Sequence, residues 1–479
     1  MKRFFYCIFS FLLFFNTVLV AQSITWQKSY NSVYNRNDFA EDVCQADSGN
    51  FFVVGSVKTY PGNYGLIYLF KIDKYGDTLW TRFVGDSING GSFGKAITSS
   101  GDGGCVITGW QGYYTYAIKY NSNGYVVWEK LFGGAIEQTY DIMKTDDGNF
   151  IGCGRKSFDF GLIFKIDSFG NLLWQKQYSA GYSKTFRKVV PAIDNGYVLI
   201  GTIRNSQIDT PRGLITKIDT GGNIIWEKNF IEITGTSIFD IDTTNNQYLI
   251  CGPTDDTNYN SKIFFKRFNI NGEEIYNKLF TANDEEFYPQ IKSINRNLYL
   301  MSIIRDTFTT TLQNYTKIIF TDSVGNILKQ KNYFSSDDLE IISLKVIDNN
   351  SFMLVGSVDE LSTIWADAYL IKTDTTLVAI PIKINSNNIN IPDKFSIYNY
   401  PNPFNTNTEI HFEIYKNSRI KIVMYDITGK EVQELVNNDL KVGIYETNFN
   451  AGNLASGVYF ITLYANNIKQ ITKKIVLLK

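Results

Sequence analysis

Short apolar runs separated by turn residues follow one another along most of this chain. Clear examples are FFVVGSV from Phe51, LIYLFKID from Leu66 and DTLWTRFV from Asp77, with Gly, Asp and Asn at the joints. Runs of this kind, bounded by turn residues, are typical of β-strands. The pattern therefore predicts an all-β chain, and the aromatic content of 15% with only 9 prolines agrees with it.

The strand pattern repeats, and two columns of residues mark the repeat. A segment of Gly, three residues and an aromatic residue has copies, successively 48, 46, 52, 50 and 53 residues apart, that end at Trp80, Trp128, Trp174, Trp226, Tyr276 and, in degenerate form, Lys329. A strand-ending column adds a seventh copy: Gly55, Gly109, Gly154, Gly201, Gly252, Ser302 and Gly356. Four short strands per copy predict a seven-bladed β-propeller over residues 22–375.

The two ends of the repeat region complement each other. The seventh copy ends at residues 368–374 without the Gly-x-x-x-aromatic strand, and an orphan segment of that type, residues 24–30, precedes the first copy. We therefore expect the N-terminal strand to complete the last blade. An open β-solenoid is the alternative architecture.

The repeat resembles a family of bacterial extracellular propeller repeats that read DGGY, an apolar run, K-x-D and then G-N-x-x-W. The copies that carry the likeness include residues 102–105, 146–150, 165–167 and 217–219. The unit is also similar to the tryptophan-docking repeats of quinoprotein propellers, where Asp and Gly stand four apart. Here Asp73 and Gly76 stand three apart, so no quinone, and no other cofactor, is predicted.

The first 21 residues have the features of a signal peptide. Lys2 and Arg3 precede an apolar run from Phe4 to Phe15, and small or apolar residues end at Ala21. A membrane anchor is the alternative, but Asn16 and Thr17 leave the run shorter than a bilayer span requires. We predict a signal peptide over residues 1–21, cleaved after Ala21, and an exported protein.

Charge and histidine content narrow the function. The formal net charge of -1 gives no reason to expect a nucleic-acid partner. The single histidine, His411, follows the repeats, so no histidine-dependent catalytic or metal site is predicted within them. Cys44, Cys105, Cys153 and Cys251 match no metal-site spacing and are expected to be free thiols. A glycosidase needs only two carboxylates, which spacing alone does not identify.

Two sets of residues in the repeats are candidates for binding. One polar column at the start of each first strand could form a channel ring from Asp38, Glu137, Glu286 and Asp338, with Ser92, Thr185 and Thr236 between them. The favoured alternative is that these side chains satisfy backbone N–H groups of neighbouring blades. Outside the tryptophan column, which suits packing, Trp110 lies near Tyr113 and Tyr114 and offers a ligand surface.

The last part of the chain differs from the repeats. A linker of low aromatic content, residues 376–394, leads to about seven alternating strands over residues 395–479, which predict a small Ig-like β-sandwich. This segment looks like the type A C-terminal sorting domain of the bacterial type IX secretion system. The residues that carry the likeness are Tyr400, Pro401, Asn402, Pro403, Gly429, Lys430, Leu454, Gly457, Tyr459 and Lys479. An ordinary Ig-like binding module is the alternative.

The resemblance implies recognition by the type IX machinery and release from the cell, or attachment at the outer-membrane surface. For the passenger we predict a non-enzymatic binding or adhesion module with an extracellular glycan or protein ligand. One alternative is an enzyme that acts on extracellular polysaccharide through channel carboxylates. Another is a structural surface component.

Overall fold

The computed structural model describes most of the chain from residue 25 onward. It describes residues 25–32, 37–58, 65–85, 91–134, 137–157, 159–179, 181–205, 208–230, 238–255, 261–281, 285–295, 298–306, 315–334, 338–348, 350–359, 366–375, 395–400, 402–414, 416, 418–440, 443–452 and 454–479. The predicted signal peptide, the linker at 376–394 and Pro401 lie outside these residues.

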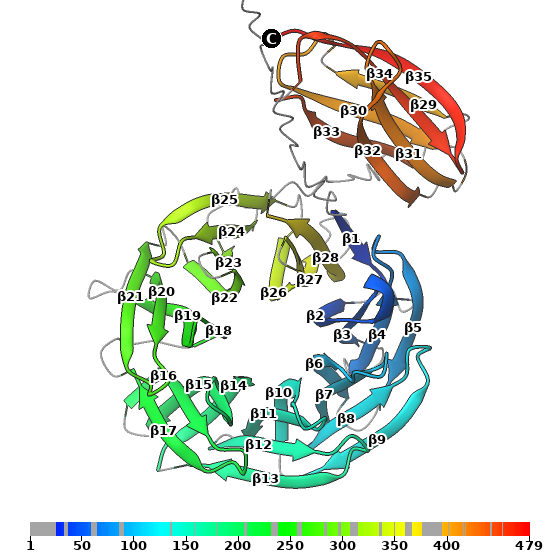
Figure 1. Cartoon of the computed structure of the whole chain (residues 1–479). Helices are drawn as coiled ribbons and strands as arrows, with labels where there is room; N and C mark the ends of the chain where they lie inside the picture. Colours follow the sequence, from blue (N-terminus) through cyan, green and yellow to red (C-terminus); the bar gives the residue numbers. More distant parts are fainter. Residues whose placement is uncertain are drawn as a thin grey trace, which may run out of the picture.

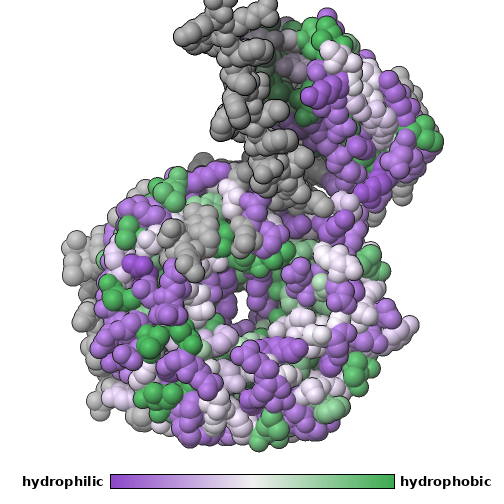
Figure 2. Space-filling view, viewed as in Figure 1, coloured by the Kyte–Doolittle hydropathy of each residue, from purple (hydrophilic) through white to green (hydrophobic). Residues whose placement is uncertain are grey.

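Seven four-stranded antiparallel sheets of the described residues are arranged in a ring (Figure 1), which the space-filling view shows open at its centre (Figure 2). Numbered along the chain, sheets 1 to 3 are β2 (Asp38–Gln45), β3 (Phe51–Lys58), β4 (Gly65–Ile72) and β5 (Thr78–Val84); β6 (Ser92–Ser99), β7 (Cys105–Gln111), β8 (Tyr114–Tyr120) and β9 (Val126–Phe132); β10 (Glu137–Lys144), β11 (Phe150–Lys156), β12 (Phe160–Ile166) and β13 (Leu172–Tyr178).

Sheets 4 to 7 continue the same order, with the first strand nearest the channel. They are β14 (Ser183–Pro191), β15 (Tyr197–Asn205), β16 (Ile208–Ile218) and β17 (Ile224–Asn229); β18 (Asp240–Thr244), β19 (Gln247–Asp255), β20 (Ser261–Phe268) and β21 (Glu274–Thr281); β22 (Glu285–Asn295), β23 (Leu298–Asp306), β24 (Tyr315–Thr321) and β25 (Ile327–Phe334); β26 (Asp338–Val346), β27 (Ser351–Asp359), β28 (Ala366–Asp374) and β1 (Trp26–Tyr30). The fold is all-β and propeller-like. The sole helical element described is the short 3-10 turn Asp47–Gly49.

The middle strands of each sheet are apolar on both faces because a neighbouring sheet packs against each face. In β3, Phe51, Phe52, Val53 and Val54 are all buried. Phe51 and Val53 join one core cluster, and Phe52 and Val54 join the next. The alternating sides of a strand thus serve two different interfaces, which is why these runs are continuously hydrophobic.

The strand β1 closes the ring. It pairs antiparallel with β28, from Trp26 opposite Lys372 to Tyr30 opposite Ala368. Trp26 is only 1% exposed and belongs to the tryptophan column of the repeat, so the first described strand supplies the fourth strand of sheet 7.

The Gly-x-x-x-Trp repeat fastens each outer strand to the next sheet. The indole N–H of Trp128 donates to the carbonyl of Ser168, at 3.0 Å, in the turn before β13. Gly170 in that turn has φ +80°, and a Cβ there would lie 2.8 Å from the Trp128 ring. The glycine is required both by the left-handed turn and by the close approach of the ring.

The C-terminal segment folds into two further sheets that share one core. The three-stranded sheet contains β29 (Ser396–Tyr400), β30 (Asn407–Ile414) and β33 (Gly443–Asn450), and the four-stranded sheet contains β31 (Ser418–Tyr425), β32 (Glu431–Leu440), β34 (Gly457–Ala465) and β35 (Ile468–Leu477). Ile397 and Phe412 from one sheet join Ile422, Leu463 and Ile475 from the other in the core cluster. No helix in the described residues is long and apolar enough to cross a membrane.

Candidate functional site

A β-bulge in the first strand of the sheets sets which side chains reach the channel. The register shifts in six of the described inner strands, β2, β6, β10, β14, β22 and β26. A bulge turns the following side chains and bends the strand. The residues after the bulge, with Asp240 at the same place in β18, are Asp42, Ala96, Asp141, Lys188, Asp240, Gln290 and Ser343.

Four of these residues, with Lys345, form a charged belt: Asp42, Asp141, Lys188, Asp240 and Lys345. Asp240 is fully buried, and its carboxylate contacts the ammonium groups of Lys188 at 2.5 Å and Lys292 at 2.8 Å. On another part of the belt, Asp42 contacts Lys345 at 3.1 Å and accepts a hydrogen bond from the Ser343 hydroxyl at 2.8 Å.

The belt aspartates also connect neighbouring sheets. The backbone N–H groups of Ile97, Val189 and Ile291 donate to Asp42, Asp141 and Asp240 at 3.2, 2.9 and 2.9 Å. Each donor lies one residue after the bulge position of a following sheet. The aspartate therefore satisfies a backbone donor that the irregular strand leaves unpaired.

Burial and neighbouring charges shift the ionisation of the belt in opposite directions. Burial raises the pKa of Asp141 above its ordinary value, despite Lys188 and Lys345 nearby. Burial acts in the same sense on Asp240, but the two adjacent lysines outweigh it and lower its pKa. Burial lowers the pKa of Lys292, whereas Asp240 and Asp141 outweigh burial at Lys188 and raise its pKa. The Lys188 contact is also the shorter of the two that Asp240 makes with lysines, at 2.5 Å against 2.8 Å.

One end of the channel, which we name the aromatic mouth, lies at the start of the inner strands. Its cavity of about 360 Å³ is lined by three aromatic side chains, Phe39, Tyr140 and Phe239, with charged residues between them. Lys95 forms an ion pair with Glu41, and the guanidinium of Arg187 lies 4.9 Å from the centre of the Phe239 ring. Figure 2 shows the ring hollowed at its centre.

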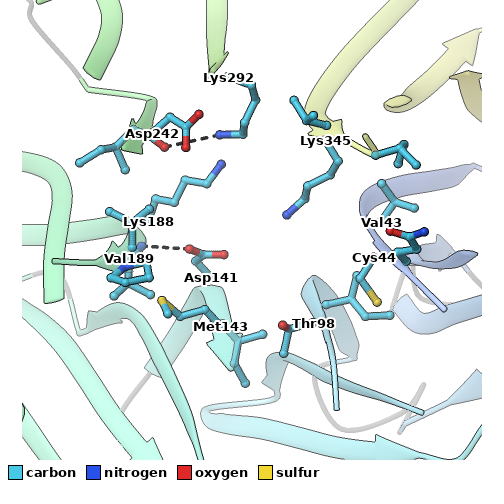
Figure 3. A pocket seen from close by; sticks show the side chains of 18 residues that line it. Val43, Cys44, Thr98, Asp141, Met143, Lys188, Val189, Asp242, Lys292 and Lys345 are labelled. Carbon is cyan, nitrogen blue, oxygen red and sulfur yellow. Dashed lines mark hydrogen bonds between the residues drawn. The ribbon is translucent and has the colours of Figure 1, made fainter. Parts of the chain in front are cut away.

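The other end, the aliphatic mouth, has a cavity of about 370 Å³ whose walls include Val43, Met143, Val190 and Ile347. Figure 3 shows Lys188, Lys292 and Lys345 projecting into this space from different sheets, with Asp141 and Asp242 beside them. Asp141, Lys188 and Lys345 line both cavities. These three residues of the charged belt therefore lie where the two mouths meet.

Those side chains of the predicted channel ring that the structure describes do not line the channel cavities. Asp38 and Glu137 are fully buried, and neither lines the two channel cavities. Glu137 contacts Lys156 at 3.0 Å and accepts hydrogen bonds from Thr115 and Gln175, while Asp38 accepts one from the Ser32 N–H. Glu286 and Asp338 belong to β22 and β26, but their side chains are outside the described set.

The predicted aromatic surface lies beside the aromatic mouth. The centres of the Trp110 and Tyr140 rings lie 6.3 Å apart in an edge-to-face arrangement, and the Lys95 ammonium lies 5.7 Å from the centre of the Trp110 ring. Both Tyr140 and Lys95 line the mouth. Tyr113 and Tyr114, by contrast, are 65% and 48% exposed at the turn between β7 and β8. The structure thus joins Trp110 to the channel through its neighbours.

The sorting-signal residues hold the two ends of the C-terminal domain together. Asn402 donates to the carbonyl of Lys474 and accepts from the N–H of Val476, while Pro403 precedes Phe404, which is buried. Gly429 and Lys430 form the turn before β32, where Asp426 accepts the Lys430 N–H at 3.0 Å.

The remaining motif residues lie around the start of β34. Leu454 packs against the core, Gly457 begins the strand and the Tyr459 hydroxyl donates to the Ala455 carbonyl. The Lys479 ammonium donates to the carbonyl of Gly452 at 2.7 Å. Tyr400 belongs to β29, but its side chain, like all of Pro401, is outside the described set.

The thiols and the channel carboxylates form no metal cluster. In the part of the chain that the structure describes, no three His, Cys, Asp or Glu side chains are placed to share an ion. The four described cysteines are free, and Cys105, Cys153 and Cys251 are buried between sheets.

Sequence reasoning missed the bulge column because its members, from Asp42 through Ala96 to Lys188, share no chemical type. The usable signal was their position, since all lie 12 or 13 residues before the column of Gly55, Gly109, Gly154, Gly201, Gly252, Ser302 and Gly356, which lies within the second strands.

Comparison with known proteins gives a family for the tail. Residues 398–478 match the model of the secretion system C-terminal sorting domain. The predicted type IX sorting tail is therefore confirmed, and it implies export through that system to the medium or the cell surface. No curated protein matches the chain.

Solved structures show weak likeness to the chain. The chain is similar to Drosophila Plexin A in complex with Semaphorin 1b, with 10% identity over 73% of this chain and 87% of that chain and a TM-score of 0.44. It is also similar to the β-propeller domain of the Trilobed protease from Pyrococcus furiosus, with 9% identity over 70% of this chain and 95% of that chain and a TM-score of 0.40. A protein of unknown function from Dyadobacter fermentans has 10% identity over 73% of this chain and 98% of that chain, with a TM-score of 0.42. These likenesses say nothing about what this chain binds.

Proposed function

We propose that the ring is a seven-bladed β-propeller passenger that acts as a non-enzymatic binding or adhesion module outside the cell. In this proposal the signal peptide over residues 1–21 is removed after Ala21, and an Ig-like, type A tail then directs the passenger through the type IX system. Because the tail directs the passenger out of the cell, its ligand in this proposal is an extracellular glycan or protein.

The observation that carries the binding role is the aromatic mouth. Phe39, Tyr140 and Phe239 place apolar surfaces around a cavity whose other walls are charged and polar. Concave sites that combine apolar walls with a few fixed polar groups are the usual form of ligand pockets. Phe39 and Tyr140 lie on inner strands of different sheets and Phe239 directly precedes β18, so the sheets fix the spacing of the three rings.

The channel carboxylates support binding over hydrolysis. A glycosidase needs one carboxylate to donate a proton and a second to act as base or nucleophile. Asp42 and Asp240 each hold a lysine and a backbone N–H, so their lone pairs are engaged in stabilising the ring. Asp141 has a raised pKa and faces both cavities, and it keeps the polysaccharide-acting enzyme as the second candidate.

The test is a ligand screen on the purified full chain. Thermal unfolding is followed with neutral oligosaccharides, peptides and divalent cations, and released reducing sugar is measured in parallel. Ligand at about 100 times its Kd adds about 2.7 kcal/mol, which raises Tm by about 2–4 °C for a domain of this size. We expect such a shift without sugar release.

Three results would change the assignment. Sugar release that disappears in Asp141→Asn would establish the enzyme. No shift with any probe, with the ring intact, would favour a structural surface component. A shift that survives substitution of every aromatic side chain in the mouth would move the binding site away from the channel.

A further inference from the structure

Asp141 differs from the other carboxylates of the charged belt in how few partners it has. In the described part of the chain it accepts one hydrogen bond, from the Val189 N–H to Oδ2 at 2.9 Å. Asp240 contacts two lysines and two backbone N–H groups. Asp141 lines both cavities, so its second oxygen is available to a group in the channel.

Several charged side chains at the channel form ion pairs. Glu41 is matched by Lys95 at the aromatic mouth, and Asp42 by Lys345 in the belt. Lys188 and Lys292 share Asp240. A free ion would have to displace these pairs, whereas a hydroxyl both donates and accepts and carries no charge to desolvate.

The arrangement along the channel also limits the ligand. The two cavities, of about 360 and 370 Å³, meet at Asp141, Lys188 and Lys345. The rings of Tyr140, Phe39 and Phe239 lie on the aromatic-mouth side of these three residues. A ligand that fits has apolar faces at one end for the rings and several hydroxyls at the other end for the belt. A chain of pyranose rings has both.

We propose that the channel binds the end of a neutral oligosaccharide, inserted through the aromatic mouth, with Asp141 accepting a sugar hydroxyl and Tyr140 packing against a sugar face. The inference rests on the proposed binding function and names the class of its ligand. Lys188, from the sheet next to that of Asp141, and Lys345, from sheet 7, donate to ring or hydroxyl oxygens of the sugar.

The test uses the full chain and titration calorimetry with neutral tetrasaccharides of glucose, mannose and N-acetylglucosamine. Oligogalacturonate and spermine serve as anionic and cationic competitors. Asp141→Asn keeps an acceptor for Val189 but removes the charged one, and Tyr140→Leu keeps bulk but removes the ring. We expect each to raise Kd about tenfold for the tetrasaccharide that binds. The matched control Asp322→Asn changes an exposed turn outside the channel and leaves Kd unchanged.

The outcomes separate this inference from the function beneath it. Binding of spermine, oligogalacturonate or a peptide, but of no neutral sugar, overturns the oligosaccharide and keeps the binding module. Neutral sugar binding that neither variant weakens places the sugar outside the channel and also overturns the inference. Failure of every probe to bind the folded chain sinks both proposals.

Discussion

The outer and inner strands of the ring use their side chains in different ways. At the outer edge, Trp26, Trp80, Trp128 and Trp226 make the same contact, with the indole N–H donated to a carbonyl in the turn of the following sheet. At the inner edge, the positions that follow the bulge hold a different residue type in most sheets: Asp, Ala, Asp, Lys, Asp, Gln and Ser. The recurring tryptophan serves the interface between sheets, whereas inner positions such as Asp42 and Asp141 combine a hydrogen bond to the neighbouring sheet with a place in the channel wall.

The largest expected effect tests the outer edge. Trp26 and Trp128 make the same 3.0 Å hydrogen bond, but Trp26 is 1% exposed and closes the ring, whereas Trp128 is partly exposed. We expect Trp26→Ala to lower the free energy of unfolding by about 3–5 kcal/mol and Trp128→Ala by about 2 kcal/mol. Guanidinium unfolding of the ring measures both. Equal losses would mean that closure contributes nothing beyond the common contact.

The next effect tests whether the inner charges also stabilise the ring. Asp240→Asn leaves Lys188 and Lys292, both partly buried, close together without their shared counter-charge, so we expect a loss of about 3 kcal/mol at pH 7. Asp322→Asn, in a turn away from the belt, provides the control: it keeps an acceptor for the Asn326 N–H and should cost less than about 1 kcal/mol. A midpoint for Asp240→Asn equal to that of the control would show that the belt has no structural role.

The smallest effect concerns Asp38, where burial raises the pKa from 3.8 to about 6. Because the folded pKa lies above the unfolded one, ionisation opposes folding, and stability is lost as pH rises from about 4 to about 6. Asp38→Asn retains an acceptor for the Ser32 N–H, so we expect a gain of about 1–2 kcal/mol at pH 7.

That gain should disappear near pH 3, where the wild-type carboxyl is protonated in both states. Unfolding midpoints of wild type and variant, compared at the two pH values, make the measurement. A variant that is less stable than wild type at pH 7 would show that the charge of Asp38 is compensated in the folded ring.

The sequence predicted what the repeat makes periodic. The Gly-x-x-x-Trp column, the seven strand-ending positions and the orphan Trp26 all reflect contacts that recur, so counting residues was enough to find them. The sorting motifs were recognisable for a similar reason, because Asn402, Phe404 and the final strand must meet in one geometry.

The site was less predictable because a bulge changes which residue faces the channel. The column chosen from sequence, represented by Asp38 and Glu137, starts the inner strand but turns into the sheet interfaces. The residues after the bulge reach the channel instead, and Ala96 and Lys188 hide the column because they are chemically unrelated to Asp42. Trp110 was found because a tryptophan outside its repeat position is conspicuous even without a register.

The pairing of β1 with β28 also sets an order of assembly during export. Trp26 lies opposite Lys372, so the closing contact joins two strands from opposite ends of the passenger. Because a chain is made from its N-terminus, β1 must wait, unpaired, until β28 has been made. Contacts between such distant segments form slowly, because the whole intervening chain loses freedom when they close. The ring can therefore close only after all of its strands are present.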